Sequence, residues 1–175
     1  MNPSATKHYD TKEYDQIIGR HKSSPGALLT VLEEAQRITP HSYLPEPAIK
    51  YIAEKMDVPL SRIYSVVTFY SFFNLKPQGD QTITVCRGTA CHTRGSRALL
   101  NDLMLRLGFE DDDDSEGETS FTTDDMRFTV RTVACFGQCA LAPVIAVDEV
   151  IHSRMTSEKL EDLLKKLTAE KKAKK

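Results

Sequence analysis

Apolar residues recur every three or four positions through the first 75 residues, and this is the spacing of one face of an α-helix. Prolines and short polar stretches separate four such segments. Pro25 and Pro47 stand where the first turn of a helix tolerates a residue without an N–H. The inward positions are Tyr14, Ile17 and Ile18; Leu28, Leu29, Leu32, Ala35 and Ile38; Ile49, Ile52, Ala53 and Met56; and Ile63, Val66, Val67 and Tyr70. The pattern predicts a small bundle of four short helices over residues 11–77.

From Gln81 onward the apolar pattern changes to that of strands, interrupted by two helical segments. Strands are predicted at residues 81–85, 126–133, 144–147 and 150–151, and helices from Gly95 or Ser96 to Gly108 and from about Thr156 onward. This β-α-β-β-α order is typical of a thioredoxin-like α/β domain with a mixed sheet. The fold class is therefore α+β, with a flexible N-terminus (1–10), the helical bundle (11–77), the thioredoxin-like domain (81–170) and a Lys-rich tail (171–175).

Composition and charge exclude several classes of function. The chain of 175 residues is 40% hydrophobic and 27% charged, which is ordinary for a soluble globular protein. Its net charge of −2, without a basic stripe interleaved with aromatic residues, argues against nucleic-acid binding. The N-terminus lacks the apolar core of a signal peptide, and no apolar run is long enough to span a membrane. A cytoplasmic location without direct membrane insertion is expected.

The four cysteines of the chain form two close pairs, and each pair follows a predicted strand. Cys86 and Cys91 follow the first strand, and Cys135 and Cys139 follow the second, so that two neighbouring strand ends could present four sulfurs to one point. Structural disulfides are uncommon in a reducing cytoplasm. Four thiolates can hold either a zinc ion or an iron–sulfur cluster, and the C-x4-C and C-x3-C spacings leave both alternatives open.

The residues around the cysteines resemble a known signature. The segments from Cys86 to Gly95 and from Cys135 to Asp148 are similar to the motifs of the thioredoxin-like [2Fe–2S] ferredoxin family, and the resemblance extends over about residues 12–170. That family includes the small iron–sulfur subunit of respiratory complex I. It also includes matching subunits of NAD(P)-linked, often electron-bifurcating, [FeFe]-hydrogenases and of NAD-dependent formate dehydrogenases. The resemblance implies one [2Fe–2S] cluster, with Cys86, Cys91, Cys135 and Cys139 as its iron ligands.

Function follows from what such a cluster can do. A [2Fe–2S] centre moves one electron at a time, whereas a nicotinamide gives up a two-electron hydride, so a flavin must split the pair. The chain has no dinucleotide fingerprint and no catalytic constellation beyond the thiols. It is therefore expected to be non-catalytic alone, with FMN and NAD(P)H on a neighbouring flavin-binding iron–sulfur subunit. The Cys-x-Gly-Thr-Ala-Cys-His form favours the hydrogenase-linked members. The alternatives are complex I, formate dehydrogenase or, from another class, a zinc-stabilised interaction module.

Further segments carry secondary hypotheses. The rings of Tyr64, Phe69, Tyr70, Phe72 and Phe73 are interpreted mainly as bundle core, although Phe69–Phe73 are too closely spaced to share one helical face, so some point onto the second domain or a partner. The helix after Cys91 is expected to stabilise thiolate charge with its N-terminus.

The acidic run 110–118 is interpreted as a solvated loop without calcium-site spacing, and residues 149–154 depart from the family pattern. Candidates for tuning the cluster from outside its ligand set are Arg87, Thr89, His92 and Gln138.

Overall fold

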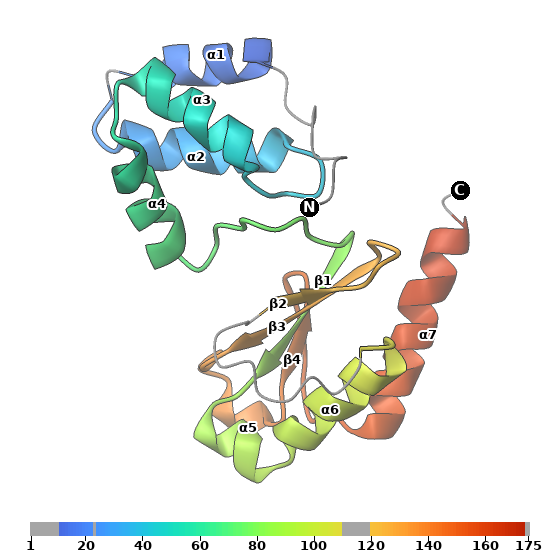
Figure 1. Ribbon diagram of the computed structural model, residues 1–175. Helices are drawn as coiled ribbons and strands as arrows, with labels where there is room; N and C mark the ends of the chain where they lie inside the picture. Colours follow the sequence, from blue (N-terminus) through green and yellow to red (C-terminus); the bar gives the residue numbers. More distant parts are fainter. Residues whose placement is uncertain (1–10, 23, 110–119, 174–175) are drawn as a thin grey trace. The chain divides into compact units, whose positions relative to one another are not determined.

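The computed structural model describes residues 11–22, 24–109 and 120–173, in two compact units, Met1–Gln78 and Gly79–Lys175 (Figure 1). The predicted flexible N-terminus, the acidic run 110–118 and the last two residues of the Lys-rich tail lie outside the described residues. None of the described helices is both long and apolar enough to cross a lipid bilayer.

The first unit consists of the four predicted helices. They are α1 (Thr11–His21), α2 (Ala27–Ile38), α3 (Glu46–Met56) and α4 (Leu60–Phe69). Pro47 lies in the first turn of α3, as expected, whereas α2 begins two residues after Pro25, behind Gly26. Gly26 has a φ of 77°, a left-handed conformation that glycine adopts without strain, and this explains the later start.

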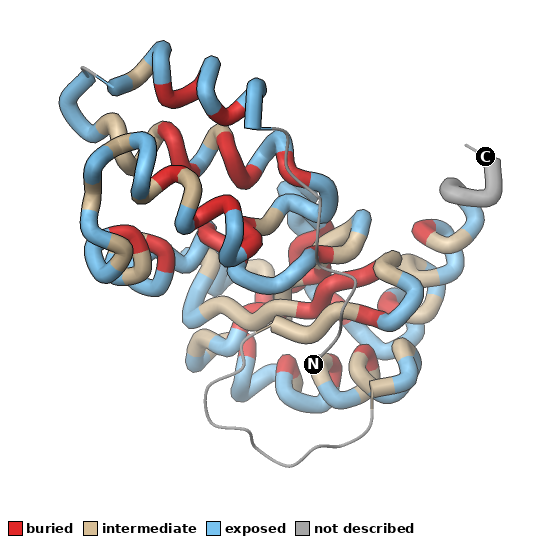
Figure 2. Tube along the Cα trace, turned by 45° about the horizontal axis from the view of Figure 1, so that its top comes forward, coloured by how far each residue is buried: buried red, intermediate tan, exposed pale blue. Residues whose placement is uncertain are grey.

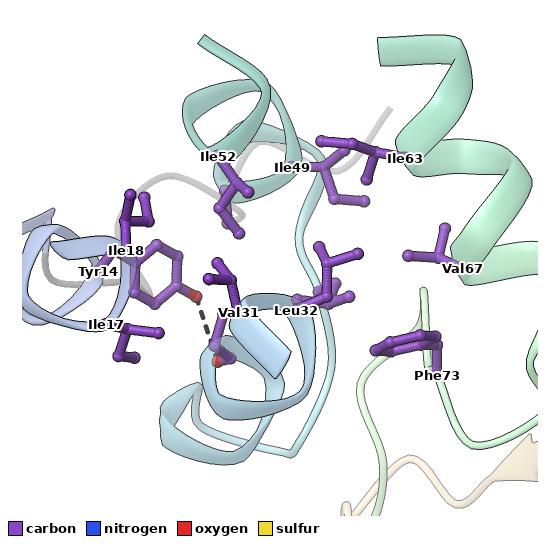
Figure 3. Packing of buried hydrophobic residues seen from close by; sticks show 13 residues of the cluster. Tyr14, Ile17, Ile18, Val31, Leu32, Ile49, Ile52, Ile63, Val67 and Phe73 are labelled. Carbon is purple, nitrogen blue, oxygen red and sulfur yellow. Dashed lines mark hydrogen bonds between the residues drawn. The ribbon is translucent and has the colours of Figure 1, made fainter. Parts of the chain in front are cut away.

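Apolar faces of all four helices meet in one core within this unit (Figure 3). Tyr14 is 1% exposed, and its hydroxyl points toward α2, where it contacts the Ala35 carbonyl (3.4 Å) and the Thr39 Oγ1 atom (2.6 Å). These contacts satisfy a polar group that would otherwise be costly to bury. Phe73 follows α4 and lies beside Leu32 and Val67, so the core extends beyond the last helix.

The second unit is built on a five-stranded mixed sheet with the order β2-β3-β1-β4-β5. The strands are β1 (Gln81–Cys86), β2 (Ser120–Thr122), β3 (Phe128–Val133), β4 (Ile145–Val147) and β5 (Val150–His152). β1 and β3 pair in parallel over six residues, from Gln81 opposite Phe128 to Cys86 opposite Val133. The other neighbouring strands pair in antiparallel fashion. This mixed sheet confirms the predicted fold class.

Three α-helices complete the second unit, namely α5 (Thr89–Thr93), α6 (Ser96–Arg106) and α7 (Ser157–Ala173). Helices α6 and α7 pack on one face of the sheet, where Leu103 and Leu160 contact a core that includes Ile83 and Val130. All three residues of β4 and the first three residues of β3 are buried, whereas β2 and β5, at the edges of the sheet, contain no buried residue (Figure 2). Because α7 continues through Ala173, part of the predicted Lys-rich tail is helical.

Local structure differs from the prediction at three places. The three-residue strand β2 was not expected, because a strand this short carries little periodicity. Met126 belongs to a turn with a φ of 55°, so β3 begins at Phe128. The helix predicted to begin at Gly95 or Ser96 is α6 and begins at Ser96, but the short helix α5, which contains Cys91, was not expected; Gly95, with a φ of 94°, separates the two helices.

Candidate metal centre

The parallel pairing of β1 and β3 brings the two cysteine segments to the same edge of the sheet. Cys86 is the last residue of β1 and is paired with Val133, the last residue of β3. The next residue, Arg87, donates its backbone N–H to the Val133 carbonyl (2.8 Å). Cys135 lies two residues after Val133 in the sequence. The expected juxtaposition of the two strand ends is therefore confirmed, and it depends on tertiary pairing between residues about 50 positions apart in sequence.

The first cysteine pair is buried. Cys86 and Cys91 are 2% and 3% exposed and pack in a small apolar cluster with Ala142 and Val144. The backbone N–H of Cys86 donates to the Val144 carbonyl (3.2 Å). Cys91 is part of the short helix α5. Both sulfurs are thus placed by regular elements and by the core of the second unit.

The second cysteine pair is exposed. Cys135 lies in the segment after β3, and Cys139 begins a single 3₁₀ turn, Cys139–Leu141. Gly137 adopts a φ of 76°, and its N–H donates to the Cys135 sulfur (3.2 Å). All four cysteines line one pocket, together with Gly88, Ala90, Phe136, Gln138 and Val144. The fold therefore gathers the two pairs around a common space.

Burial, backbone N–H groups and neighbouring thiols shift the pKa values of Cys86, Cys91 and Cys139. Burial by itself raises the pKa of the Cys86 thiol. Hydrogen bonds from the N–H groups of Gly88 and Phe136, and from the thiols of Cys91 and Cys135, outweigh burial and leave that pKa below its ordinary value. Burial and the hydrogen bond to Cys86 raise the pKa of Cys91, although the Val144 N–H acts in the opposite direction. The sulfur of Cys86 is therefore the preferred thiolate of the buried pair.

The pKa of Cys139 is also raised. Its hydrogen bond with the Cys135 sulfur is the largest cause, and the charge of that sulfur adds to it. Deprotonation of several thiols at once is thus opposed by their mutual repulsion. A bound metal cation offsets the repulsion between the thiolates, and it therefore favours their deprotonated form.

Gly88 leaves room that the Cys135 sulfur occupies. A Cβ atom at position 88 would lie 3.0 Å from the Ala134 carbonyl oxygen and 3.3 Å from the Cys135 sulfur. The close approach of the first cysteine segment to the second therefore favours a residue without a side chain at position 88. Together with the N–H groups directed at sulfur, this cradle fits a thiolate-bound cluster whose sulfur atoms accept hydrogen bonds.

The four sulfurs line one pocket but do not form a site for a single metal ion. Within residues 11–22, 24–109 and 120–173, no three His, Cys, Asp or Glu side chains are placed to bind a single metal ion. The four cysteines as one ligand set therefore stay a prediction. A [2Fe–2S] cluster takes two ligands at each of its two irons, so two pairs that line one pocket are compatible with it.

The candidates for tuning the cluster lie around this pocket. Gln138 lines it, whereas Arg87, Thr89 and His92 do not belong to its lining. Phe136 and Val144 could not be recognised from the sequence, because their contribution comes from backbone N–H groups, which any residue type can supply.

Arg94 was not among the candidates either, although it reaches the second cysteine segment. Its guanidinium donates to the carbonyl of Ala142 (3.3 Å). The position of Arg94 three residues after Cys91 was the only signal available in the sequence. The contact itself depends on how the fold brings the two segments together.

A family model for the thioredoxin-like [2Fe–2S] ferredoxins matches residues 14–168 of the chain. The chain belongs to this family. The assignment confirms the resemblance seen in the sequence, the [2Fe–2S] cluster as cofactor and a role in electron transfer.

Related thioredoxin-like [2Fe–2S] ferredoxins come from two kinds of enzyme. The chain is 35% identical over 153 residues to the NADP-reducing hydrogenase subunit HndA of Solidesulfovibrio fructosivorans, covering 87% of this chain and 84% of that protein. It is 37% identical over 141 residues to a subunit of the NADH-quinone oxidoreductase of Rickettsia bellii, covering 81% and 79% of the two chains.

A solved structure shows the same fold. In the crystal structure of an air-oxidised NAD+-reducing [NiFe]-hydrogenase, the match has a TM-score of 0.64 and 25% identity over 86% of this chain. The present chain spans only 24% of that hydrogenase chain.

Proposed function

We propose that this chain holds one [2Fe–2S] cluster on Cys86, Cys91, Cys135 and Cys139 and serves as a one-electron relay subunit of a multisubunit NAD(P)-linked oxidoreductase. FMN and NAD(P)H belong to a neighbouring subunit, and the whole complex works in the cytoplasm or at the cytoplasmic face of a membrane. The observation that carries the proposal is the convergence of both cysteine pairs on one pocket at the ends of β1 and β3.

The surroundings of the four cysteines support a role in electron transfer. When bound, the cluster accepts and releases single electrons. The core of the second unit buries Cys86 and Cys91 away from water, whereas Cys135 and Cys139 remain at the surface. N–H groups of Gly88, Phe136 and Gly137 donate to the sulfurs and stabilise their negative charge. The exposed pair offers a short path for electron exchange with another protein.

A hydrogenase-type complex is the first choice of parent complex. The Cys-x-Gly-Thr-Ala-Cys-His form from Cys86 to His92 supports it, and so does the likeness to a subunit of an NADP-reducing hydrogenase. The similar likeness to an NADH-quinone oxidoreductase subunit supports complex I as the alternative. Formate dehydrogenase is a further alternative from the sequence resemblance. Co-purification of the chain from its own cells, followed by identification of the subunits and assay of hydrogen, quinone and formate turnover, separates the three.

The cluster itself is tested on protein purified without oxygen. We expect about two irons and two sulfides per chain and a rhombic S = 1/2 EPR signal after reduction with dithionite. A zinc-stabilised module is the competing function, and it would contain zinc without sulfide. Zinc without sulfide in protein that has never been exposed to air would contradict the electron-relay proposal.

Outward aromatic rings of the first unit are proposed as the contact with the partner subunit. Phe73 is buried, whereas Phe69 is 78% exposed and contacts the ring of Tyr70 at 5.0 Å between ring centroids. The interpretation of the aromatic run as core is therefore right for Phe73 and wrong for Phe69. The neighbouring backbone is held firmly, because Gln36 bonds both the Phe72 carbonyl and the Asn74 N–H. Exposed aromatic residues on a rigid backbone are typical anchors of protein interfaces.

The Phe69→Ala variant tests this contact. We expect weaker co-purification with the flavin-binding subunit and an unchanged iron content. Leu105→Ala is the matched control, because Leu105 is similarly exposed (74%) but belongs to α6 of the second unit. If Phe69→Ala loses iron while complex formation persists, the ring serves folding rather than docking.

A further inference from the structure

The segment that follows the second cysteine pair is held to the rest of the second unit through its carbonyl groups. Four consecutive carbonyls, at positions 141–144, each accept one hydrogen bond. Backbone N–H groups supply three of these bonds: Arg154 to Leu141 (2.8 Å), Met155 to Pro143 (3.0 Å) and Cys86 to Val144 (3.2 Å). The fourth donor is a side chain, and it belongs to Arg94.

Arg94 connects the two cysteine segments. Its backbone N–H donates to the Cys91 carbonyl (3.1 Å), so the residue is attached to the end of α5. Its guanidinium donates to the carbonyl of Ala142, three residues after Cys139 (3.3 Å). Ala142 is 4% exposed and packs in the same small cluster as Cys86 and Cys91. One residue therefore contacts both halves of the proposed cluster site.

The charge of Arg94 is available to this site. Among the described residues, its guanidinium forms no ion pair, although other arginines of the unit do: Arg106 pairs with Asp102 and Glu161, and Arg127 with Asp125. A guanidinium keeps its positive charge throughout the working range of pH. A cluster with four thiolate ligands is negatively charged, and reduction makes it more so, so a nearby cation favours the reduced form.

We propose that Arg94 is a positioning residue for the cluster, which joins the exposed cysteine segment to the buried one and raises the reduction potential through its charge. The inference rests on the proposed function, since it requires that the four cysteines hold a cluster. The hydrogen bond limits the motion of the segment that carries Cys139, which has little burial of its own. Loss of the side chain should therefore affect retention of the cluster as well as its potential.

The test compares Arg94→Gln with Arg94→Lys and Arg97→Gln. Glutamine removes the charge and the long donor, whereas lysine keeps the charge but not the planar fork. Arg97 is the control, because it is also exposed, lies in the first turn of α6 and makes no side-chain hydrogen bond or ion pair within the described residues. Each protein is loaded with its cluster, its iron release to a chelator is timed, and its potential is measured by an EPR-monitored redox titration.

We expect Arg94→Gln to release iron about tenfold faster than wild type, as is common when a group that supports metal ligands is removed. Its potential should move to a more negative value. Arg94→Lys should release iron at an intermediate rate and keep a potential near that of wild type, and Arg97→Gln should match wild type in both measurements. Amide exchange over residues 139–144 should be faster in Arg94→Gln than in Arg97→Gln.

Several outcomes would overturn the inference. An iron-release rate of Arg94→Gln equal to that of Arg97→Gln contradicts the joining role, and an equal potential contradicts the role of the charge. If Arg94→Gln is not recovered folded, the Arg94→Lys variant tests the joining role. Iron release from Arg94→Lys at the same rate as from Arg97→Gln then contradicts that role. Wild-type protein without iron and sulfide contradicts the proposed function instead, so the two failures are distinguishable.

Discussion

The two cysteine pairs of this ferredoxin differ in how the fold holds them. Cys86 ends the central strand β1, which has neighbours on both sides, and Cys91 lies in α5; both are almost completely buried. Cys135 and Cys139 are exposed, in a segment with only one 3₁₀ turn of regular structure. The first pair therefore depends on the hydrophobic core, and the second on individual hydrogen bonds.

With the proposed cluster ligands, this difference predicts that one half of the site forms when the chain folds, while the other half gains its final order from the metal. Burial in a packed core restricts a side chain to a narrow range of positions. Exposed loops open locally at much lower cost in free energy. A site of this kind can accept a cluster from the solvent side and then be closed by the ligands of the exposed segment.

The largest expected effect separates the two pairs by substitution. Cys86→Ser should abolish iron binding, because a buried strand end cannot shift to bring the shorter serine oxygen to the metal. Cys135→Ser should retain a reduced but measurable amount of iron, because its exposed segment can move toward the cluster. Iron and sulfide content, together with the visible absorption spectrum, measures both. Equal retention in the two variants would show that the pairs are held alike.

A second expectation concerns thiol reactivity in the reduced, metal-free chain. Cys135 and Cys139 should react with iodoacetamide at least about tenfold faster than Cys86 and Cys91, since a buried thiol must wait for local opening. The hydrogen bond and the charge of Cys135 raise the pKa of Cys139, so its thiolate fraction and its rate should keep increasing into the alkaline range. Mass spectrometry of time points at several pH values measures each site. Uniform rates at all four cysteines would contradict the division into buried and exposed halves.

The smallest expected effect lies where the two halves meet, at Gly88. A methyl group in Gly88→Ala must push against the Ala134 carbonyl and the Cys135 sulfur, and such crowding costs about 1 kcal/mol. We expect a roughly fivefold faster release of iron and little change in the folding of the chain. Gly19→Ala is the matched control, because a Cβ at this position in α1 contacts nothing within 4 Å. An iron-release rate of Gly88→Ala equal to that of Gly19→Ala would show that the segment of Ala134 and Cys135 moves aside without weakening the site.

Much of the fold could be predicted from periodicity. The four helices of the first unit, the principal strands and the two long helices of the second unit each carry enough apolar positions to be recognised. The short elements could not be, since α5 and β2 contain five and three residues and exist through contacts with distant segments. Phe121 of β2, for example, contacts the ring of Phe109, and β2 pairs with β3.

The residues able to hold the cluster can be named without a structure, because thiolate chemistry and the motif around Cys86 and Cys135 are properties of the local chain. The inequality of the two pairs emerges only when the chain is folded. Burial, the N–H groups of Phe136 and Val144 and the contact of Arg94 depend on the pairing of β1 with β3 and with β4, which are far from it in the sequence. Local patterns specify residue chemistry and elements, whereas the surroundings of a side chain result from packing between elements, which no local pattern encodes.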